Sequence, residues 1–331
     1  MILLSSFNEG LSDIMKAYLI YAVGVIFLAV GCASVPGDAI KVGTYNIRYS
    51  GVNGSADRGT PNAWVERKGD LLALVSRLDL DVFGLQEVCP DQAKFLRENL
   101  PEYEFVGEHR NADRVSDEAS PVCYRKSRFD LLAKGTFWLS ETPDIPGRRG
   151  WGAGCPRVCS YLVLRDRLSG KRFCFANTHT DHVSELARKN GMLLVIERMK
   201  KIGDGIPVVF TGDHNCLETD APAKAVAAIL RDALYESETT PRGSWRSASG
   251  WKWLAHEVSI SEALDATVDE RNSRDESLSG IDAYGKYGMR IDYIYVSPDV
   301  RVLDYETIND ARPGKKLYPS DHFPVVATIE L

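Results

Sequence analysis

The 331-residue chain contains few residues that bind zinc or form disulfides, with seven cysteines and six histidines. Seven cysteines in a chain of this length are too few for a disulfide-stabilised scaffold. No C-x-x-C pair is present, and Cys155-x-x-x-Cys159 has no matching second pair, so no structural zinc site is expected. Cys123 and Cys174 lie inside apolar runs and are expected to be free, buried thiols.

The chain also lacks an excess of positive charge. It has 40 Lys and Arg against 46 Asp and Glu, a formal net charge of −6. This balance argues against a broad basic face that holds nucleic acid by displacing its counterions, although a small basic groove is compatible with it. A hydrophobic content of 44% is ordinary for a globular protein and excludes wholesale disorder.

A membrane-spanning helix needs about 20 consecutive apolar residues, and no segment of the chain supplies them. The apolar run at 17–31 is 15 residues long and follows Met15-Lys16, which is typical of a secretory signal peptide. The run ends in LAVGC, which resembles a bacterial lipobox. We therefore expect residues 1–31 to be removed and a lipid on Cys32 to anchor the chain in the bacterial envelope, facing the periplasm or the outside. A buried core helix is the alternative for this run.

The remainder predicts a short tether over 32–39 and one domain over 40–331. Residues 239–287 are rich in Ser, Gly and charged residues, which predicts a long surface excursion rather than a second domain. Three tryptophans of this excursion, Trp245, Trp251 and Trp253, are expected either to pack on their own domain or to contact a base, a sugar ring or lipid.

Apolar periodicity predicts strands alternating with helices. The expected strands cover residues 40–48, 82–88, 103–107, 120–125, 129–138, 158–165, 172–178, 208–211, 291–296 and 325–329. The expected helices cover residues 64–78, 92–99, 184–201 and 221–230, with Asn62 as the N-cap of the first.

Polar residues follow six of the apolar runs. These segments are TYNIR at 44–48, LQEV at 85–88, NTHTDH at 177–182, TGDHN at 211–215, RIDYI at 290–294 and SDHFPV at 320–325. A single carboxylate after a strand is usually a turn former or a helix cap, but six such segments indicate a site. Their oxygen donors suit Mg²⁺ or Mn²⁺. Histidines beside carboxylates suit acid–base chemistry near neutral pH.

In this order the six segments resemble those of the endonuclease/exonuclease/phosphatase superfamily, the DNase I-like metal-dependent phosphoesterases, over residues 40–331. The resemblance implies a four-layer α/β sandwich, with two packed mixed sheets flanked by helices and the active site at one edge. It also implies hydrolysis of phosphodiester or phosphomonoester bonds with Mg²⁺, or Mn²⁺, as cofactor.

The resemblance further implies roles for particular residues. The metal-site residues are Asn46, Glu87 and Asp321. The catalytic residues are His179, Asp213, Asn215, Asp292, His322 and Glu118, with Asp292 orienting His322 and Glu118 the partner of His179. Arg157 is expected to bind the substrate phosphate, and Tyr124 either lines the pocket or belongs to the core. His214 replaces a frequent Phe, which puts the substrate preference in doubt more than the chemistry.

The substrate stays open at this stage. A phosphate ester of nucleic acid, of a phospholipid or of an inositol phosphate is compatible with the motifs, and we favour a diester over a monoester. The alternative function is a non-catalytic, ligand-binding envelope lipoprotein that retains the fold. The complete set of acidic, basic and metal-site residues argues for the enzyme. We expect a monomer and infer no protein partner.

Overall fold

The computed structural model describes residues 36–331, in which one compact unit comprises Asp38–Leu331. The predicted signal peptide and the lipid-bearing Cys32 lie outside the described residues and stay predictions. Within the described range, no helix combines the length and the apolar character that a bilayer crossing requires. All six cysteines of this range are free thiols, and five of them are buried.

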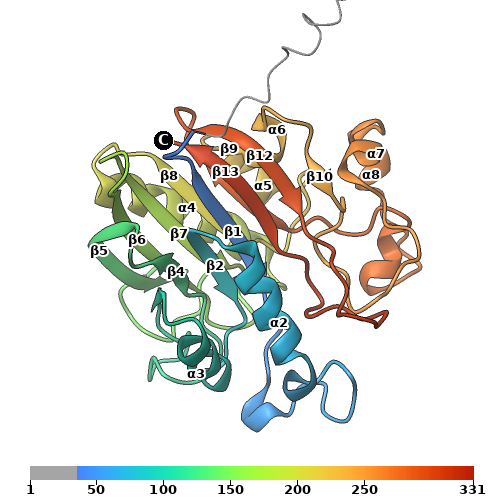
Figure 1. Cartoon of the computed structure of the whole chain (residues 1–331). Helices are drawn as coiled ribbons and strands as arrows, with labels where there is room; N and C mark the ends of the chain where they lie inside the picture. The colour runs from blue at the N-terminus through green and yellow to red at the C-terminus, as the bar shows by residue number, and fades with distance from the viewer. Residues whose placement is uncertain (1–35) are drawn as a thin grey trace, which may run out of the picture. The chain divides into compact units, whose positions relative to one another are not determined.

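Two mixed β-sheets form the centre of the fold. The seven-stranded sheet runs in the order β10 (Arg242–Gly243), β12 (Arg301–Thr307), β13 (Val325–Glu330), β1 (Ile40–Asn46), β2 (Val82–Gln86), β4 (Val122–Arg125) and β3 (Tyr103–Val106). The six-stranded sheet runs in the order β5 (Phe129–Trp138), β6 (Val158–Asp166), β7 (Arg172–His179), β8 (Val208–Asp213), β11 (Asp292–Val296) and β9 (Arg231–Asp232). Figure 1 shows β1 and β13, from opposite ends of the domain, paired side by side.

Helices connect the strands, and four of them cover the outer faces of the two sheets. Their bounds are η1 (Val52–Gly54), α2 (Trp64–Leu78), α3 (Pro90–Asn99), α4 (Glu185–Gly203), α5 (Ala221–Ala227), α6 (Ala233–Glu236), α7 (Ile260–Leu264), α8 (Val268–Arg271) and η2 (Gly280–Tyr284). Apolar residues of α2 and α3 pack on β2, and those of α4 and α5 pack on β7 and β8. The predicted four-layer α/β sandwich is therefore confirmed.

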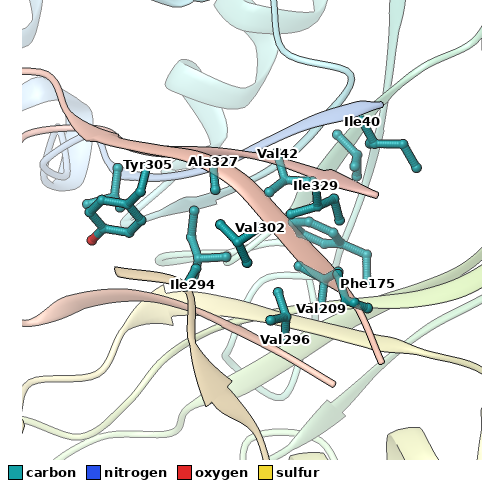
Figure 2. Close-up of a cluster of buried hydrophobic side chains, with 14 of the residues drawn as sticks. Ile40, Val42, Phe175, Val209, Ile294, Val296, Val302, Tyr305, Ala327 and Ile329 are labelled. Atoms are coloured by element: carbon teal, nitrogen blue, oxygen red, sulfur yellow. The ribbon is translucent and has the colours of Figure 1, made fainter. Parts of the chain in front are cut away.

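The inner faces of the two sheets meet in the main hydrophobic core. Val42 and Ile329 come from the larger sheet and face Val209 and Ile294 of the smaller one (Figure 2). These strands are buried on both faces, one in this core and the other against the helices, which is why they read as apolar runs in the sequence.

Strand direction brings the polar segments to one edge. β1 runs parallel to β2, and β7 runs parallel to β8, so the carboxyl ends of each pair lie together. The two sheets are joined just below this edge, where the Gln86 side chain donates to Asn177 Oδ1 at 2.6 Å. Gly84 permits this close approach, because a Cβ there would lie 2.1 Å from Asn177 Oδ1.

The region 239–287 belongs to the same compact unit, and one of its tryptophans takes the first of its two predicted positions, packing on its own domain. Trp245 is only 1% exposed and lies in the core between the sheets, together with Val258, Ile260 and Ala263. Apolar residues scattered through this region therefore pack it on the domain. They form no periodic pattern in the sequence from which their burial could be predicted. The N-cap of α2 is Ala63 rather than Asn62, and the elements that were not predicted are β9, β10, β12, η1, α6, α7, α8 and η2.

Candidate active site

A buried histidine–carboxylate pair forms the most tightly bonded part of the site. Asp292 begins β11, and its Oδ2 lies 2.8 Å from Nδ1 of His322. Burial alone would lower the pKa of His322, but the carboxylates of Asp292 and Asp213 outweigh it and hold that pKa well above its usual range. His322 therefore carries a positive charge at neutral pH.

A segment of the 239–287 region fixes both members of this pair, and we call Ser247–Gly250 the serine segment. The hydroxyl of Ser247 accepts from the backbone N–H of Asp292 at 2.9 Å, and its carbonyl accepts from that of Phe323 at 2.6 Å. The N–H of Ser249 donates to the Asp321 carbonyl at 2.7 Å. The backbone of the residues before and after His322 is thus bonded to the serine segment, which is itself bonded to the first residue of β11.

Asp213, the last residue of β8, lies between the two catalytic histidines. Its Oδ2 is 3.7 Å from Nε2 of His322 and 3.4 Å from Nε2 of His179, and it accepts from Nδ2 of Asn46 at 2.9 Å. Burial and the nearby charge of Asp292 raise the pKa of Asp213 to about 7. A carboxylate in this range is suited to accept a proton at neutral pH.

His179 ends β7 and is held in one tautomer. Nδ2 of Asn215 donates to the Thr180 carbonyl at 3.0 Å, which can only accept, and also lies 2.9 Å from His179 Nε2. Nε2 is therefore the unprotonated nitrogen, and the proton is on Nδ1. Burial and the charge of Arg157 hold the pKa of His179 well below its usual range, so this imidazole is neutral.

Glu118 faces His179 but is bound by another residue. Its Oε2 is 3.9 Å from His179 Nδ1, beyond hydrogen-bond distance, whereas Arg110 contacts both of its oxygens at 2.9 Å. Burial and the charge of Glu87 raise the pKa of Glu118 to about 7. Glu118 and His179, the predicted pair, therefore lie next to each other in the structure but do not form a hydrogen bond.

The three predicted metal-site residues lie together. Asn46 Nδ2 donates to Glu87 Oε1 at 3.0 Å, and its Oδ1 keeps one lone pair after accepting from the N–H of Arg48. Burial and the charge of Glu87 raise the pKa of Asp321, against the opposing charges of His322 and of Arg48, which lies 3.7 Å away. Two carboxylates and an amide oxygen are ligands that fit a hard divalent cation.

Glu87 has an unusual backbone conformation, with φ of 62°. A non-glycine residue in this region costs free energy and is held by its surroundings. Oε2 of Glu87 accepts from the N–H of Tyr49 at 2.8 Å, which fixes the side chain toward Asn46.

Arg157 lies beside this centre, 5% exposed, and its charge acts on both His179 and Glu118. Its Nη2 is 3.0 Å from Nδ1 of His182, and its Nε is 3.8 Å from Asp181. Cys155, Asp181 and His182 offer ligand atoms close enough for a metal. The Arg157 guanidinium beside them disfavours a second cation, and Asp181 already accepts two backbone N–H groups at the start of α4.

Tyr124 is the predicted site residue that the structure places elsewhere. It pairs in register with Val82, at the opposite end of β2 from Glu87, and its ring belongs to the core between the sheets. Of its two predicted positions the core is therefore the observed one, because strand alternation turns Tyr124 inward next to Val122.

Three residues that contribute to the site were not assigned from the sequence. Arg110 lies in the irregular loop between β3 and β4, and Ser247 lies in a serine-rich stretch, so neither carries a motif. Arg48 is part of the TYNIR segment, which could have identified it as a partner of Asp321. Apart from Tyr124, the structure brings all ten remaining predicted site residues to one edge of the two sheets.

Comparison with known proteins identifies relatives of this chain. The model of the Endonuclease/Exonuclease/phosphatase family matches residues 43–322. A solved structure of a mannosyl-6-phosphatase from Bacteroides thetaiotaomicron is 31% identical, with 88% of this chain and 100% of that chain covered and a TM-score of 0.70. An endonuclease/exonuclease/phosphatase from Bacteroides vulgatus is 29% identical, with coverages of 88% and 99% and a TM-score of 0.72.

Curated relatives are longer than this chain. Nocturnin of Drosophila melanogaster is 24% identical in an alignment of 343 positions, and 90% of this chain and 48% of that protein are covered. Uncharacterized protein R895 of Acanthamoeba polyphaga mimivirus is 27% identical over 240 residues, with 63% of this chain and 34% of that protein covered. The chain thus spans between a third and a half of the length of these two relatives.

Proposed function

The chain belongs to the endonuclease/exonuclease/phosphatase family, whose members are phosphoesterases and nucleases, and we propose from this premise that it is a divalent-metal-dependent phosphoesterase. The observation that carries the proposal is the arrangement of Asp213, with a charged histidine on one side and a neutral histidine on the other. A ligand-binding protein without catalysis has no need for this division of charge.

Asn46, Glu87 and Asp321 would hold the metal, for which we propose Mg²⁺. A divalent cation at these oxygens supplies positive charge to the phosphoryl oxygens during hydrolysis. The surplus of negative charge among the three side chains supports this assignment.

The chain's own residues perform the remaining chemistry. The imidazolium of His322, oriented by Asp292, stabilises the negative charge that develops on the phosphoryl group. Arg157 adds a planar guanidinium that can bind phosphate oxygens in pairs. Asp213 accepts the proton of the attacking water, and Asn215 donates to Nε2 of His179 and so holds that ring in the tautomer with the proton on Nδ1.

We further propose a phosphate monoester of a sugar as the substrate class. A relative that is 31% identical over most of this chain is a mannosyl-6-phosphatase, which supports this class. The sequence analysis favoured a diester, but the residues at the metal do not distinguish the two ester types.

The test compares p-nitrophenyl phosphate with bis-p-nitrophenyl phosphate, each with Mg²⁺ and with EDTA. We expect metal-dependent turnover that is faster on the monoester. Glu87→Gln should lower kcat by about a hundredfold or more, because it removes one carboxylate from the metal site. Asp304→Asn, a surface carboxylate paired with Arg242, is the matched control. Turnover that is unaffected by EDTA, or a Glu87→Gln variant as active as wild type, would refute the proposal.

A further inference from the structure

A groove of about 1250 Å³ opens beside the catalytic residues, between the loop at 49–63 and the loop at 107–121. Each of these two loops also contains a residue that is linked to the site. Tyr49, in the lining of the groove, donates its N–H to Glu87, and Asp117 precedes Glu118 and shares Arg110 with it. We propose that this groove binds the uncharged sugar portion of a phosphate ester whose phosphate lies at the adjoining site. The inference rests on the proposed phosphoesterase activity and deepens it.

The charges of the lining oppose a nucleic-acid strand. Arg58 is the one cation of this lining, against the carboxylates of Glu66 and Asp91, and the third carboxylate, Asp117, is already paired with Arg110. Proteins that bind DNA or RNA neutralise the phosphates with several lysines or arginines along the groove. A strand that entered this groove from the site would place its phosphates beside carboxylates, so the group bound here is uncharged.

The polar and apolar residues of the lining match the two kinds of surface on a sugar. Amide and hydroxyl groups for the ring hydroxyls come from Asn53, Thr60, Asn111 and Ser116. Apolar contacts for the C–H faces come from three exposed valines, Val52, Val65 and Val115, which are 81%, 68% and 68% exposed. Three strongly exposed valines around one concave surface indicate a ligand contact rather than chance exposure.

A choline-type headgroup fits the groove less well, although the negative lining would attract a cation. Recognition of a quaternary ammonium uses open aromatic faces. The lining has two aromatic rings, and each already carries a guanidinium. Arg48 lies 4.7 Å from the centre of the Tyr49 ring, and Arg67 lies 5.1 Å from that of the Trp64 ring.

The size of the groove favours more than one sugar ring. Sites for small molecules typically enclose about 300 to 1000 Å³. The volume of about 1250 Å³ here exceeds that range. A phosphorylated oligosaccharide, with its phosphate at the metal-site residues and its second ring between the two loops, therefore fits better than a single sugar phosphate.

The experiment measures kcat/KM with Mg²⁺ for p-nitrophenyl phosphate, glucose 6-phosphate, 6′-phosphomaltose and a 5′-phosphorylated trinucleotide. We expect 6′-phosphomaltose to exceed glucose 6-phosphate, and the trinucleotide to be the poorest substrate. Val65→Trp and Val115→Trp fill the groove from its two walls. Each should lower kcat/KM for 6′-phosphomaltose about tenfold more than for p-nitrophenyl phosphate.

Val268→Trp is the matched control, because this valine is 45% exposed on α8 and outside the lining, and it should leave all four values unchanged. Circular dichroism shows whether each variant is folded. Hydrolysis of p-nitrophenyl phosphate without a preference for 6′-phosphomaltose, or equal losses on both substrates, would overturn the groove assignment alone. Absence of metal-dependent hydrolysis of p-nitrophenyl phosphate would instead overturn the proposed function.

Discussion

The two histidines of the site each face a carboxylate, yet they differ in charge. His322 bonds to Asp292 at 2.8 Å and is protonated, whereas His179 lies 3.9 Å from Glu118 and is neutral. The difference comes from the charges around each buried ring, of which the largest are Arg157 at His179 and Asp292 at His322. Arg110 neutralises Glu118, but Asp292 has no arginine or lysine in ion-pair contact within the described range.

This comparison shows that a His–carboxylate pair in a sequence does not define the state of the imidazole. The charge of a buried histidine depends on the net charge of its surroundings, which includes residues from distant loops. Arg157 and Arg110 both lower the pKa of His179, while Asp213 and Asp292 raise that of His322. The site thereby holds one cationic and one neutral imidazole on the two sides of Asp213.

Replacing Asp292 should have the largest effect on this comparison. Asp292→Asn removes the charge that keeps His322 protonated and oriented, so kcat should fall by about a hundredfold to ten-thousandfold. Steady-state kinetics at saturating metal measure the loss, and the melting temperature of the variant checks its fold. A folded variant with less than about a tenfold loss would show that the pair is structural.

Replacing Glu118 should have a much smaller effect. Glu118→Gln keeps the shape of the side chain, and the pKa of about 7 means that the native carboxyl is partly protonated at neutral pH. Because His179 does not bond to it, kcat should fall by no more than about tenfold. A loss as large as that of Asp292→Asn would mean that the two pairs are equivalent in the working enzyme.

A third histidine, His214, extends the comparison to a buried imidazole that has no carboxylate partner among the described residues. The ring of His214 stacks between Phe210, Tyr293 and Tyr295, and neither ring nitrogen has a hydrogen-bond partner among residues 36–331. Burial lowers its pKa to about 3. Above pH 6.5 the ring is neutral whether the chain is folded or unfolded. Below that pH, only the unfolded chain takes up the proton, so the folded state loses stability as the pH falls.

His214→Phe removes this acid-induced loss. Between pH 7 and pH 5, the free energy of unfolding of the variant should rise relative to wild type by about 2 kcal/mol. Urea unfolding at the two pH values, with EDTA in every sample to exclude metal release, measures the difference. An unchanged difference between the two proteins would mean that His214 protonates in the folded state.

The sequence predicted the fold and most of the site for a physical reason. Strands buried on both faces appear as apolar runs, and residues at their carboxyl ends, such as Asn46 and Asp213, must lie at the same edge when the strands are parallel. The polar motifs therefore located the site once the strands were placed.

The remainder depends on contacts that are distant in the sequence. Arg110 and Ser247 act from segments without periodicity, so only the folded chain reveals their partners. The position of Tyr124 depends on which face of β4 is inward, and a four-residue strand leaves that choice to its neighbours. Trp245 reaches the core from a polar region, where composition alone favoured the surface.

The serine segment connects the 239–287 region to the catalytic residues. Engineers who change the specificity of an enzyme often exchange a whole loop region and assume that the reaction centre is independent of it. Here the 239–287 region supplies the hydrogen bonds that seat Asp292 and the backbone on either side of His322. A transplant of that region from a relative would succeed only if Ser247 and its two flanking backbone bonds were retained, so the two parts are not interchangeable modules.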